Sequence, residues 1–458
     1  MARQCIFVLD VGKSNVKALV FDAQGTQLFE RSVRNAILPG PPYPHADIGS
    51  IWSFCLAALR DAGGSLAIDA IVVTTHGATA ALVDAGGLVL PVLDYEHAAI
   101  AGVEDTYSLM RPPFAQTFSP PLGGGLNLGR QLAWQRQHFA AAFAGARHLL
   151  MYPQYWTWRM TGTPVLEATS LGAHTDLWQP LEGRPSAVAQ ALGLTGILPP
   201  LVRAYDVVGV LKSDIAAACH LRHAPVVLAG IHDSNASILP HLARRTPPFT
   251  VISTGTWVIL FGLGLPLGRL DPGRDQLANI DVEGRPVACG RFMGGREYAA
   301  IAGDMPAVPV AGDVLDILRR GVLALPNFAG GSGPFPGHRA RIVGEAAGQQ
   351  ARAALATLYV ALMTDYSLDL LGATQGDLIV EGSFADNALY GALLKALRPQ
   401  QAVRMSQGAA GTARGAAMLA NWPPPVPLPD TSARAQPWPD VAALHAYRQN
   451  WRSHVDAG

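Results

Sequence analysis

Residues 9–22 read Leu9-Asp10-Val11-Gly12-Lys13-Ser14-Asn15-Val16-Lys17-Ala18-Leu19-Val20-Phe21-Asp22. The apolar run from Ile6 to Leu9 predicts a strand that ends at an aspartate. A Gly/Ser turn follows, and the run from Val16 to Phe21 predicts the returning strand. Backbone N–H groups, a small hydroxyl residue and a lysine at the tip of such a hairpin are typical of a cradle for phosphate oxygens. The aspartate is suited to hold Mg²⁺, which takes only one or two carboxylates.

Two other interpretations of this segment are a P-loop and an ordinary hairpin. The triplet Gly12-Lys13-Ser14 resembles the end of a P-loop, but that pattern needs a glycine five residues earlier, where Phe7 stands. The residues that follow are also strand-like, whereas a P-loop opens a helix. The second alternative is an ordinary hairpin with a glycine turn.

A second turn favours the phosphate interpretation. Residues 252–259 read Ile-Ser-Thr-Gly-Thr-Trp-Val-Ile, which repeats the order of apolar strand, Ser/Thr/Gly turn and apolar strand. The two hairpins each begin their own half of the chain. Together they indicate a duplicated fold that clamps a nucleotide between its halves.

Composition limits the class of protein. The chain has 458 residues, 34 Lys plus Arg and 34 Asp plus Glu, so nothing suggests binding to nucleic acid or an anionic membrane. A hydrophobic fraction of 49% with 15% charged residues predicts a globular protein with large cores. The four scattered cysteines indicate neither a zinc site nor a disulfide framework. No signal peptide and no apolar run of membrane-spanning length is expected, which predicts a cytoplasmic protein.

Strand-like and helical runs alternate along the chain. Strands are expected at residues 70–74, 88–93, 226–231 and 377–380, and helices at 48–62, 127–143, 349–371, 387–397 and 442–455. The polar, proline-rich stretch from His241 to Phe249 predicts a connection between domains. We therefore expect one domain over residues 1–240, a second over 250–430 and a tail helix within 431–458.

Several segments, taken in order, resemble the FGGY carbohydrate kinases over nearly the whole chain, and the rhamnulose and fuculose kinases in particular. They are Asp10-Val11-Gly12-Lys13-Ser14, Thr75-His76-Gly77-Ala78, Tyr155-Trp156-Thr157-Trp158-Arg159-Met160-Thr161-Gly162, Gly230-Ile231-His232-Asp233 and Ser253-Thr254-Gly255-Thr256-Trp257. A looser match is Val380–Asn387, where the family usually has two glycines before a small residue and this chain has Gly382-Ser383-Phe384. The resemblance implies an α/β fold of two actin-like (ribonuclease H-like) domains with mixed sheets, with nucleotide and sugar in the interdomain cleft.

The resemblance also implies roles for individual residues. Asp233 would be the general base that takes the proton of the attacking hydroxyl; the alternative for Asp233 is a helix N-cap. Asp10 would act in catalysis by organising Mg²⁺. The phosphates would meet Gly12, Lys13, Ser14, Lys17, Thr254, Gly255 and Thr256, and the nucleoside side would meet Gly382, Ser383 and Asn387. The sugar would meet His76, Gly77, Asp94, Tyr95, Glu96, Asp233 and Ser234. Lys17 has an alternative as a solvated strand residue.

The function expected from these residues is transfer of phosphate from ATP, with Mg²⁺, to a hydroxyl of a ketose or deoxyketose such as fuculose, rhamnulose or a pentulose. Two alternatives from other classes are an actin- or Hsp70-like nucleotide switch and a sugar sensor without activity. The sequence leaves open which sugar and which hydroxyl react. It also leaves open the oligomeric state, for which a homodimer is one option.

Overall fold

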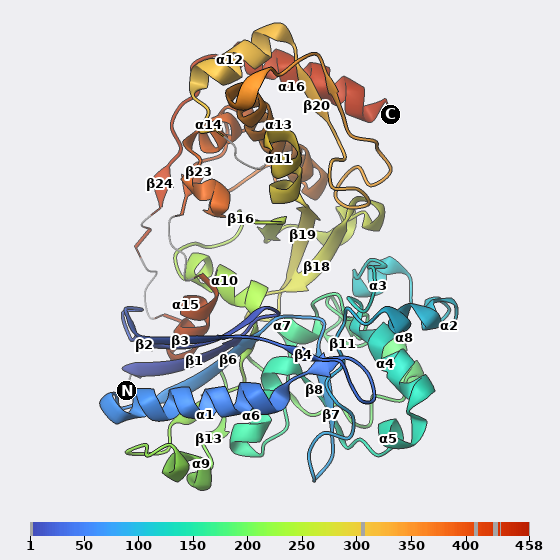
Figure 1. Ribbon diagram of the computed structural model, residues 1–458, viewed down its shortest axis with the longest axis vertical. Coiled ribbons are helices and arrows are strands. Elements are labelled where there is room, and N and C mark those ends of the chain that lie inside the picture. Colours follow the sequence, from blue (N-terminus) through green and yellow to red (C-terminus); the bar gives the residue numbers. More distant parts are fainter. Residues whose placement is uncertain (1–2, 304–306, 407–410, 425–428, 431, 458) are drawn as a thin grey trace. The chain divides into compact units, whose positions relative to one another are not determined.

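The computed structural model describes residues 3–303, 307–406, 411–424, 429–430 and 432–457. The chain forms two compact units (Figure 1). Unit 1 comprises Met1–Arg244, Ala278–Pro286 and Ala410–Leu428, and unit 2 comprises Arg245–Leu277, Val287–Ala409 and Pro429–Gly458. Each main sheet contains both parallel and antiparallel strand pairs, so the predicted pair of α/β folds with mixed sheets is confirmed.

The main sheet of unit 1 has the strand order β13-β14-β6-β1-β2-β3, and β15 also pairs with β6. Its strands are β1 (Cys5–Val11), β2 (Asn15–Asp22), β3 (Gln27–Arg34), β6 (Ala70–Thr75), β13 (Val207–Val210), β14 (Val226–Leu228) and β15 (Ile231–His232). The antiparallel β1–β2 hairpin sets Asp10 opposite Lys17, and the parallel β1–β6 pair sets Asp10 beside Thr74. The hairpin that was predicted around Gly12 is therefore present.

The alternation of side chains along β1 decides which way Asp10 points. Phe7 and Leu9 pack in one core with α1 (Ile48–Ser65) and α6 (Tyr152–Thr161). Ile6 and Val8 pack in another core with α10 (Asp233–Leu242) and α15 (Gly411–Met418), on the opposite face of the sheet (Figure 1). Since side chains alternate along a strand, Asp10 lies on the same face as Val8 and therefore on the side of α10.

The rest of unit 1 consists of short elements around a further core that includes Tyr107, Trp134 and Leu149. Its helices are α2 (Glu104–Ser108), α3 (Phe114–Thr117), α4 (Leu128–His138), α5 (Ala140–Ala144), α7 (Ala168–Leu171), α8 (Ala187–Ala191) and α9 (Ser213–Ala218). Its short strands pair as β4 (Ile37–Leu38) with β5 (His45–Ala46), β7 (Ala80–Val83) with β8 (His148–Met151), β9 (Leu166–Glu167) with β12 (Leu201–Val202), and β10 (Trp178–Gln179) with β11 (Arg184–Pro185).

The main sheet of unit 2 has the order β18-β19-β17-β16-β22-β23-β24. Its strands are β16 (Phe249–Thr254), β17 (Val258–Leu263), β18 (Gln276–Ile280), β19 (Pro286–Phe292), β22 (Leu378–Gly382), β23 (Val403–Met405) and β24 (Ala433–Arg434). The β16–β17 hairpin is the second predicted phosphate hairpin, and β16 runs parallel to β22. The turn after β16 and the end of β22 therefore meet at one edge of this sheet.

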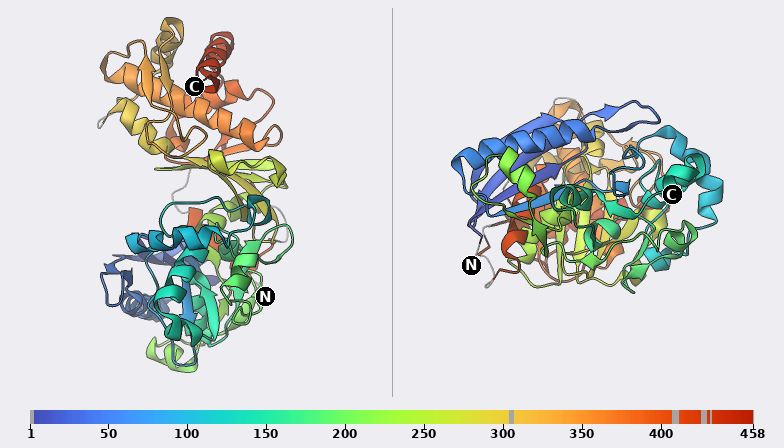
Figure 2. Two further views of the ribbon diagram at one scale, coloured as in Figure 1. Left: turned by 90° about the vertical axis from the view of Figure 1, so that its right-hand side faces the viewer. Right: turned by 90° about the horizontal axis from the view of Figure 1, so that it is seen from below.

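Unit 2 is built around α13 (Gly348–Leu371), which Figure 2 shows among the other helices of the unit. Those helices are α11 (Gly294–Ala302), α12 (Ala311–Arg320), α14 (Ala388–Leu397) and α16 (Val441–Asp456), and a short strand pair joins β20 (Leu323–Leu325) to β21 (Arg341–Val343). Among the described residues, α13 alone is long and apolar enough to cross a membrane, so the expectation that no run reaches that length was wrong. Its apolar window is 89% buried inside the fold, as in the core helix of a soluble protein.

Three predicted elements differ from the structure. The strand expected at 88–93 is replaced by isolated bridges, from Val83 to Leu88 and from His45 to Leu93. The helix expected at 127–143 breaks at Phe139 into α4 and α5. The strand expected at 226–231 is interrupted at Gly230, whose φ of 86° is incompatible with an extended strand.

Candidate active site

Asp233 is the first residue of α10, and His232 occupies the N-cap position without a side-chain capping bond. The Asp233 carboxylate accepts hydrogen bonds from the Ser234 N–H (2.6 Å) and from the Ser234 hydroxyl (3.2 Å). Its side chain is 32% exposed, so one edge of the carboxylate is open to a reactant. Asp233 is therefore the first residue of the helix rather than its N-cap, and its carboxylate accepts a hydrogen bond from the backbone of the first turn.

Asp10 lies close enough to Asp233 for their charges to interact. Burial and, second, the charge of Asp233 raise the pKa of Asp10 to about 7, against an opposing effect of Lys17. Two carboxylates that repel each other in a buried setting are a favourable place for a divalent cation. Among the described residues there is no group of three or more His, Cys, Asp or Glu side chains that could hold a metal, which is compatible with a magnesium ion that takes most of its ligands from water and phosphate.

His232 is buried beside Asp233 and held in one orientation. The Asn235 amide N–H donates to the Ile280 carbonyl, so the Asn235 Oδ1 is the acceptor for His232 Nδ1 at 2.7 Å. His232 Nδ1 therefore carries a proton and donates it to Asn235. The other ring nitrogen, Nε2, faces Asp233 Oδ1 at 3.2 Å. From the sequence, His232 was named only as part of a motif. The bond from Asn235 to the Ile280 carbonyl joins residues that are far apart in the sequence, so no local pattern indicated it.

Gly77 is needed because of His232. A Cβ at position 77 would lie 2.7 Å from His232 Nε2, which is closer than such atoms approach. The loop that carries His76 therefore packs directly on the histidine next to Asp233.

His76 joins the same site from the end of β6. Its Nδ1 donates to the Gly77 carbonyl at 3.0 Å, and burial lowers its pKa, so the imidazole is neutral. Its ring lies 5.8 Å from that of Tyr95 and 5.3 Å from that of Tyr152, centre to centre. Burial and the carboxylates Glu96, Asp94 and Asp233 raise the pKa of Tyr95 to about 12. The predicted sugar residues are thus gathered around Asp233.

Lys13 pairs with the sugar-side residues. Its ammonium forms an ion pair with Asp94, lies 3.4 Å from a Glu96 carboxylate oxygen, and sits 4.3 Å from the centre of the Tyr95 ring. We call Lys13, His76, Asp94, Tyr95 and Glu96 the sugar-side cluster. Lys13 thereby connects the first hairpin to the loop after Leu93.

Gln131 is a residue that the sequence reasoning missed. It is buried, and its side-chain amide donates to the carbonyls of Ala78 and Gly125 at 2.6 Å each. Ala78 has a φ of 54°, which is uncommon for a residue other than glycine. Gln131 thus connects the loop after His76, through Ala78, to the loop that contains Gly125. The Gly125 N–H in turn donates to the Tyr95 carbonyl.

Among the other residues of the first hairpin, Gly12 closes the turn, whereas Ser14 and Lys17 face solvent. The Gly12 N–H closes the turn by donating to the Asn15 carbonyl at 2.9 Å, so this N–H is occupied by the protein itself. Ser14 and Lys17 are exposed. Lys17 lies opposite Asp10 in the hairpin, and its ammonium acts on that carboxylate.

In unit 2, the Thr254 hydroxyl links two strands. It donates to the Glu381 carbonyl at 2.5 Å and accepts from the Phe384 N–H at 2.9 Å. Gly382 has a φ of 81°, and a Cβ there would lie 1.9 Å from the Thr254 carbonyl oxygen. Thr254 and Gly382 therefore shape this edge, while Gly255, Thr256 and Ser383 remain partly or fully exposed on it.

Asn387 lies further along the same connection and caps α14. Its side-chain oxygen accepts from the Tyr390 N–H at 3.1 Å, and its amide donates to the Thr357 hydroxyl at 3.4 Å. Both ends of the Asn387 side chain thus bond to the protein.

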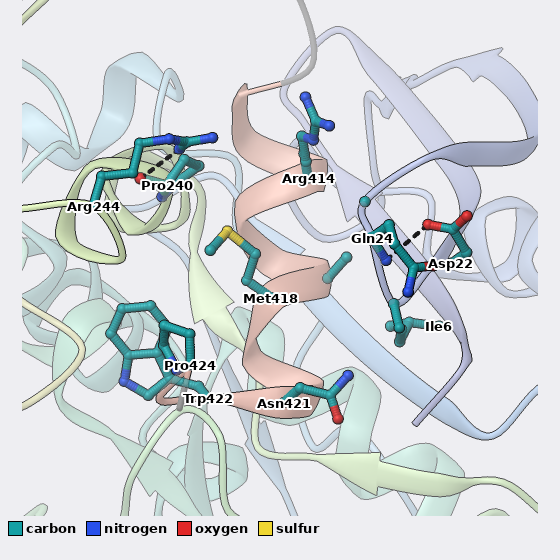
Figure 3. Close-up of a pocket in the computed structure, with 13 residues that line it drawn as sticks. Ile6, Asp22, Gln24, Pro240, Arg244, Arg414, Met418, Asn421, Trp422 and Pro424 are labelled. Carbon is teal, nitrogen blue, oxygen red and sulfur yellow. Dashed lines mark hydrogen bonds between the residues drawn. The ribbon is translucent and has the colours of Figure 1, made fainter. Parts of the chain in front are cut away.

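A separate cavity of about 470 Å³ lies in unit 1 between α15, the end of α10 and the turn after β2 (Figure 3). Its lining includes Asp22, Arg244, Arg414, Met418 and Trp422. No predicted sugar or phosphate residue is among the described residues that line it.

Two units that each have a mixed sheet flanked by helices, and in each sheet a hairpin with a glycine-containing turn, place the chain in the class of two-domain α/β proteins. The N-terminal domain of the FGGY family of carbohydrate kinases matches residues 5–240, and the FGGY carbohydrate kinase C-terminal domain matches residues 246–427. The chain belongs to the FGGY family of carbohydrate kinases.

Individual relatives agree with this family. The chain is 28% identical to an L-fuculokinase from Salmonella typhi and 25% identical to an L-xylulose/3-keto-L-gulonate kinase from Escherichia coli (strain K12). The matches cover 57% and 62% of this chain, and they span only 57% and 58% of the length of these relatives. The crystal structure of a carbohydrate kinase from Novosphingobium aromaticivorans is 36% identical over 100% of both chains, with a TM-score of 0.94.

Proposed function

We propose that this protein transfers the terminal phosphate of ATP to a hydroxyl of a ketose or deoxyketose, such as fuculose, rhamnulose or a pentulose. The observation that carries the proposal is the open edge of the Asp233 carboxylate beside Asp10 and the sugar-side cluster. Phosphoryl transfer needs little covalent help from the protein, so a well-placed base and well-placed charges are sufficient.

In this proposal Asp233 accepts the proton of the sugar hydroxyl as that oxygen attacks phosphorus. The two bonds from Ser234 to Asp233 Oδ1 hold the carboxylate in place. His76 and the carboxylates of the sugar-side cluster offer hydrogen-bond partners to the other hydroxyls. The neutral state of His76 lets its ring serve as a hydrogen-bonding group without adding charge.

ATP and Mg²⁺ are the groups that this site would use. Asp10 would hold the cation. The exposed Ser14, Lys17 and Thr256, together with the partly exposed Gly255, would contact phosphate oxygens. The cation, when bound, supplies charge that offsets the negative charge developing on the phosphoryl group. That one ATP contacts both hairpins stays a prediction, as do a cytoplasmic location and a homodimer.

The proposal is tested by the variant Asp233→Asn, measured by release of ADP with a panel of ketoses. The amide has the same shape but cannot accept the proton, so turnover is expected to fall by about 10²–10⁴-fold while the affinity for nucleotide is kept. Asp214→Asn on the exposed surface of α9 is a matched control and should behave as the wild type.

A rate above about a tenth of wild type for Asp233→Asn would show that Asp233 is not the base. Release of ADP at the same rate with and without sugars would favour a nucleotide switch. A folded wild-type protein that binds sugar but releases no ADP would favour a sensor.

A further inference from the structure

We propose that the sugar-side cluster selects neutral ketoses and rejects sugars that carry a carboxylate. This inference rests on the proposed kinase function and names the substrate class of that same site.

The positive charge of the cluster is already neutralised. Lys13 is the cation of the sugar-side cluster, and it is ion-paired with Asp94, whose side chain is only 9% exposed, and faces Glu96 as well. His76 is neutral because burial lowers its pKa. A sugar that enters the sugar-side cluster therefore meets Asp94, Glu96 and the neighbouring Asp233 as acceptors, while the ammonium of Lys13 is already paired.

The neighbouring loops do not add a free cation. Residues 79–135 contain two arginines, Arg111 and Arg130, and no lysine. Arg111 makes a two-pronged contact with the buried Asp176, with both N–O distances at 3.0 Å. Arg130 pairs with Glu104 at 2.8 Å and donates to the carbonyls of Leu122 and Gly124. Both guanidinium groups are thus used to hold these loops together.

This distribution of charge suits hydroxyl groups. Carboxylate acceptors bind hydroxyl donors well. A carboxylate on the sugar would lose its hydration beside Asp94 and Glu96, where Lys13 is already ion-paired. Like charges brought together at a binding site are strongly unfavourable and provide discrimination between ligands. The two curated relatives differ in this respect, since one is named for L-fuculose and the other also for the acid 3-keto-L-gulonate.

The test compares kcat/KM for neutral sugars (L-fuculose, L-rhamnulose and L-xylulose) with that for acidic sugars (3-keto-L-gulonate and gluconate). The best neutral sugar is expected to exceed both acids by on the order of 100-fold. Asp94→Asn keeps the shape of the side chain but releases the charge of Lys13. It is expected to shift the ratio of acidic to neutral kcat/KM upward by about tenfold. Asp105→Asn, on the exposed side of α2, is the matched control and should leave the ratio unchanged.

A second measurement works on the wild type if Asp94→Asn does not fold. Salt screens repulsion, so raising the ionic strength should increase kcat/KM for the acids relative to the neutral sugars. Preference of the wild type for an acid, an unchanged ratio in folded Asp94→Asn, or a ratio insensitive to salt would overturn the inference while leaving the kinase function intact. Failure to phosphorylate any sugar of either class would instead refute the proposed function.

Discussion

At the scale of single residues, Asp10 links the stability of the fold to pH. Its pKa of about 7 in the folded state lies above the ordinary value of 3.8, so the folded protein keeps a proton that the unfolded chain releases between these values. Stability contributed by this group is therefore present below about pH 4 and is lost as pH rises to about 7.

Asp10→Asn cannot ionise and should be more stable than the wild type at pH 8, by at most about 4 kcal/mol, because each pKa unit is worth about 1.4 kcal/mol. The difference should vanish near pH 4. Urea unfolding of both proteins across this range measures it, and a difference that does not depend on pH would refute the assignment of the shift to Asp10.

The effect of Mg²⁺ on thermal stability is a second test of the role of Asp10. If Asp10 holds the cation, MgCl₂ at pH 8 should raise the melting temperature of the wild type more than that of Asp10→Asn, because a ligand stabilises the state that binds it. Calorimetry of the two proteins with and without MgCl₂ checks this. Equal shifts for both would place the cation elsewhere.

Gly77 is the second residue whose substitution has a sharp outcome. In Gly77→Ala the new methyl group meets His232, which its bond with Asn235 prevents from turning away. We expect a loss of about 1–3 kcal/mol of stability together with impaired turnover. His232→Ala in the same chain should restore the stability but not the activity. Gly64→Ala in α1 has open space at Cβ and serves as the control; if the two single variants behave alike, the contact is unimportant.

At the scale of elements, α16 is fastened to α13 by charge. Asp365 of α13 is fully buried and pairs with Arg398 (2.7 Å), Arg448 (2.6 Å) and Arg452 (2.8 Å). Asp365→Asn leaves these guanidinium groups without part of their compensation, which is expected to cost about 3–5 kcal/mol. Asp316→Asn removes an exposed pair on α12 and should cost less than about 1 kcal/mol. Denaturant unfolding measures the free energy of unfolding of both variants. A loss for Asp365→Asn as small as that for Asp316→Asn would show that the buried ion pairs do not stabilise the fold.

The elements show what could be predicted from the sequence. Hairpins at Gly12 and Gly255 and the helix α13 follow local patterns of apolar residues and turns, and these were found. The segment expected as a strand at 88–93 forms isolated β-bridges at its two ends, with Val83 and with His45, and Pro91 between them has no N–H to donate to a ladder. In the site, Asp10, His76 and Asp233 were predicted from motifs. The contacts of Lys13 with Asp94, of Asn235 with Ile280 and of Gln131 with Ala78 depend on the folded chain.

At the scale of the whole molecule, the most apolar helix is an interior one. The buried fraction of α13 leads us to expect that the expressed chain stays in the aqueous fraction when membranes are sedimented or when detergent phases separate. Partition of folded, active protein into the membrane fraction would contradict this. Asp365→Asn offers an informative comparison, since loosening α16 should expose part of α13 and promote aggregation.

The return of Ala410–Leu428 to unit 1 has a consequence for how the protein is made. The apolar face of β1 that carries Ile6 and Val8 is completed by Ala413, Ala416 and Ala417 of α15. During translation β1 is synthesised first. The helix α15, which covers this face, is among the last elements to be synthesised, after most of unit 2. Unit 1 therefore cannot complete this core until α15 has been synthesised. We expect nascent chains that end before residue 411 to remain bound to chaperones.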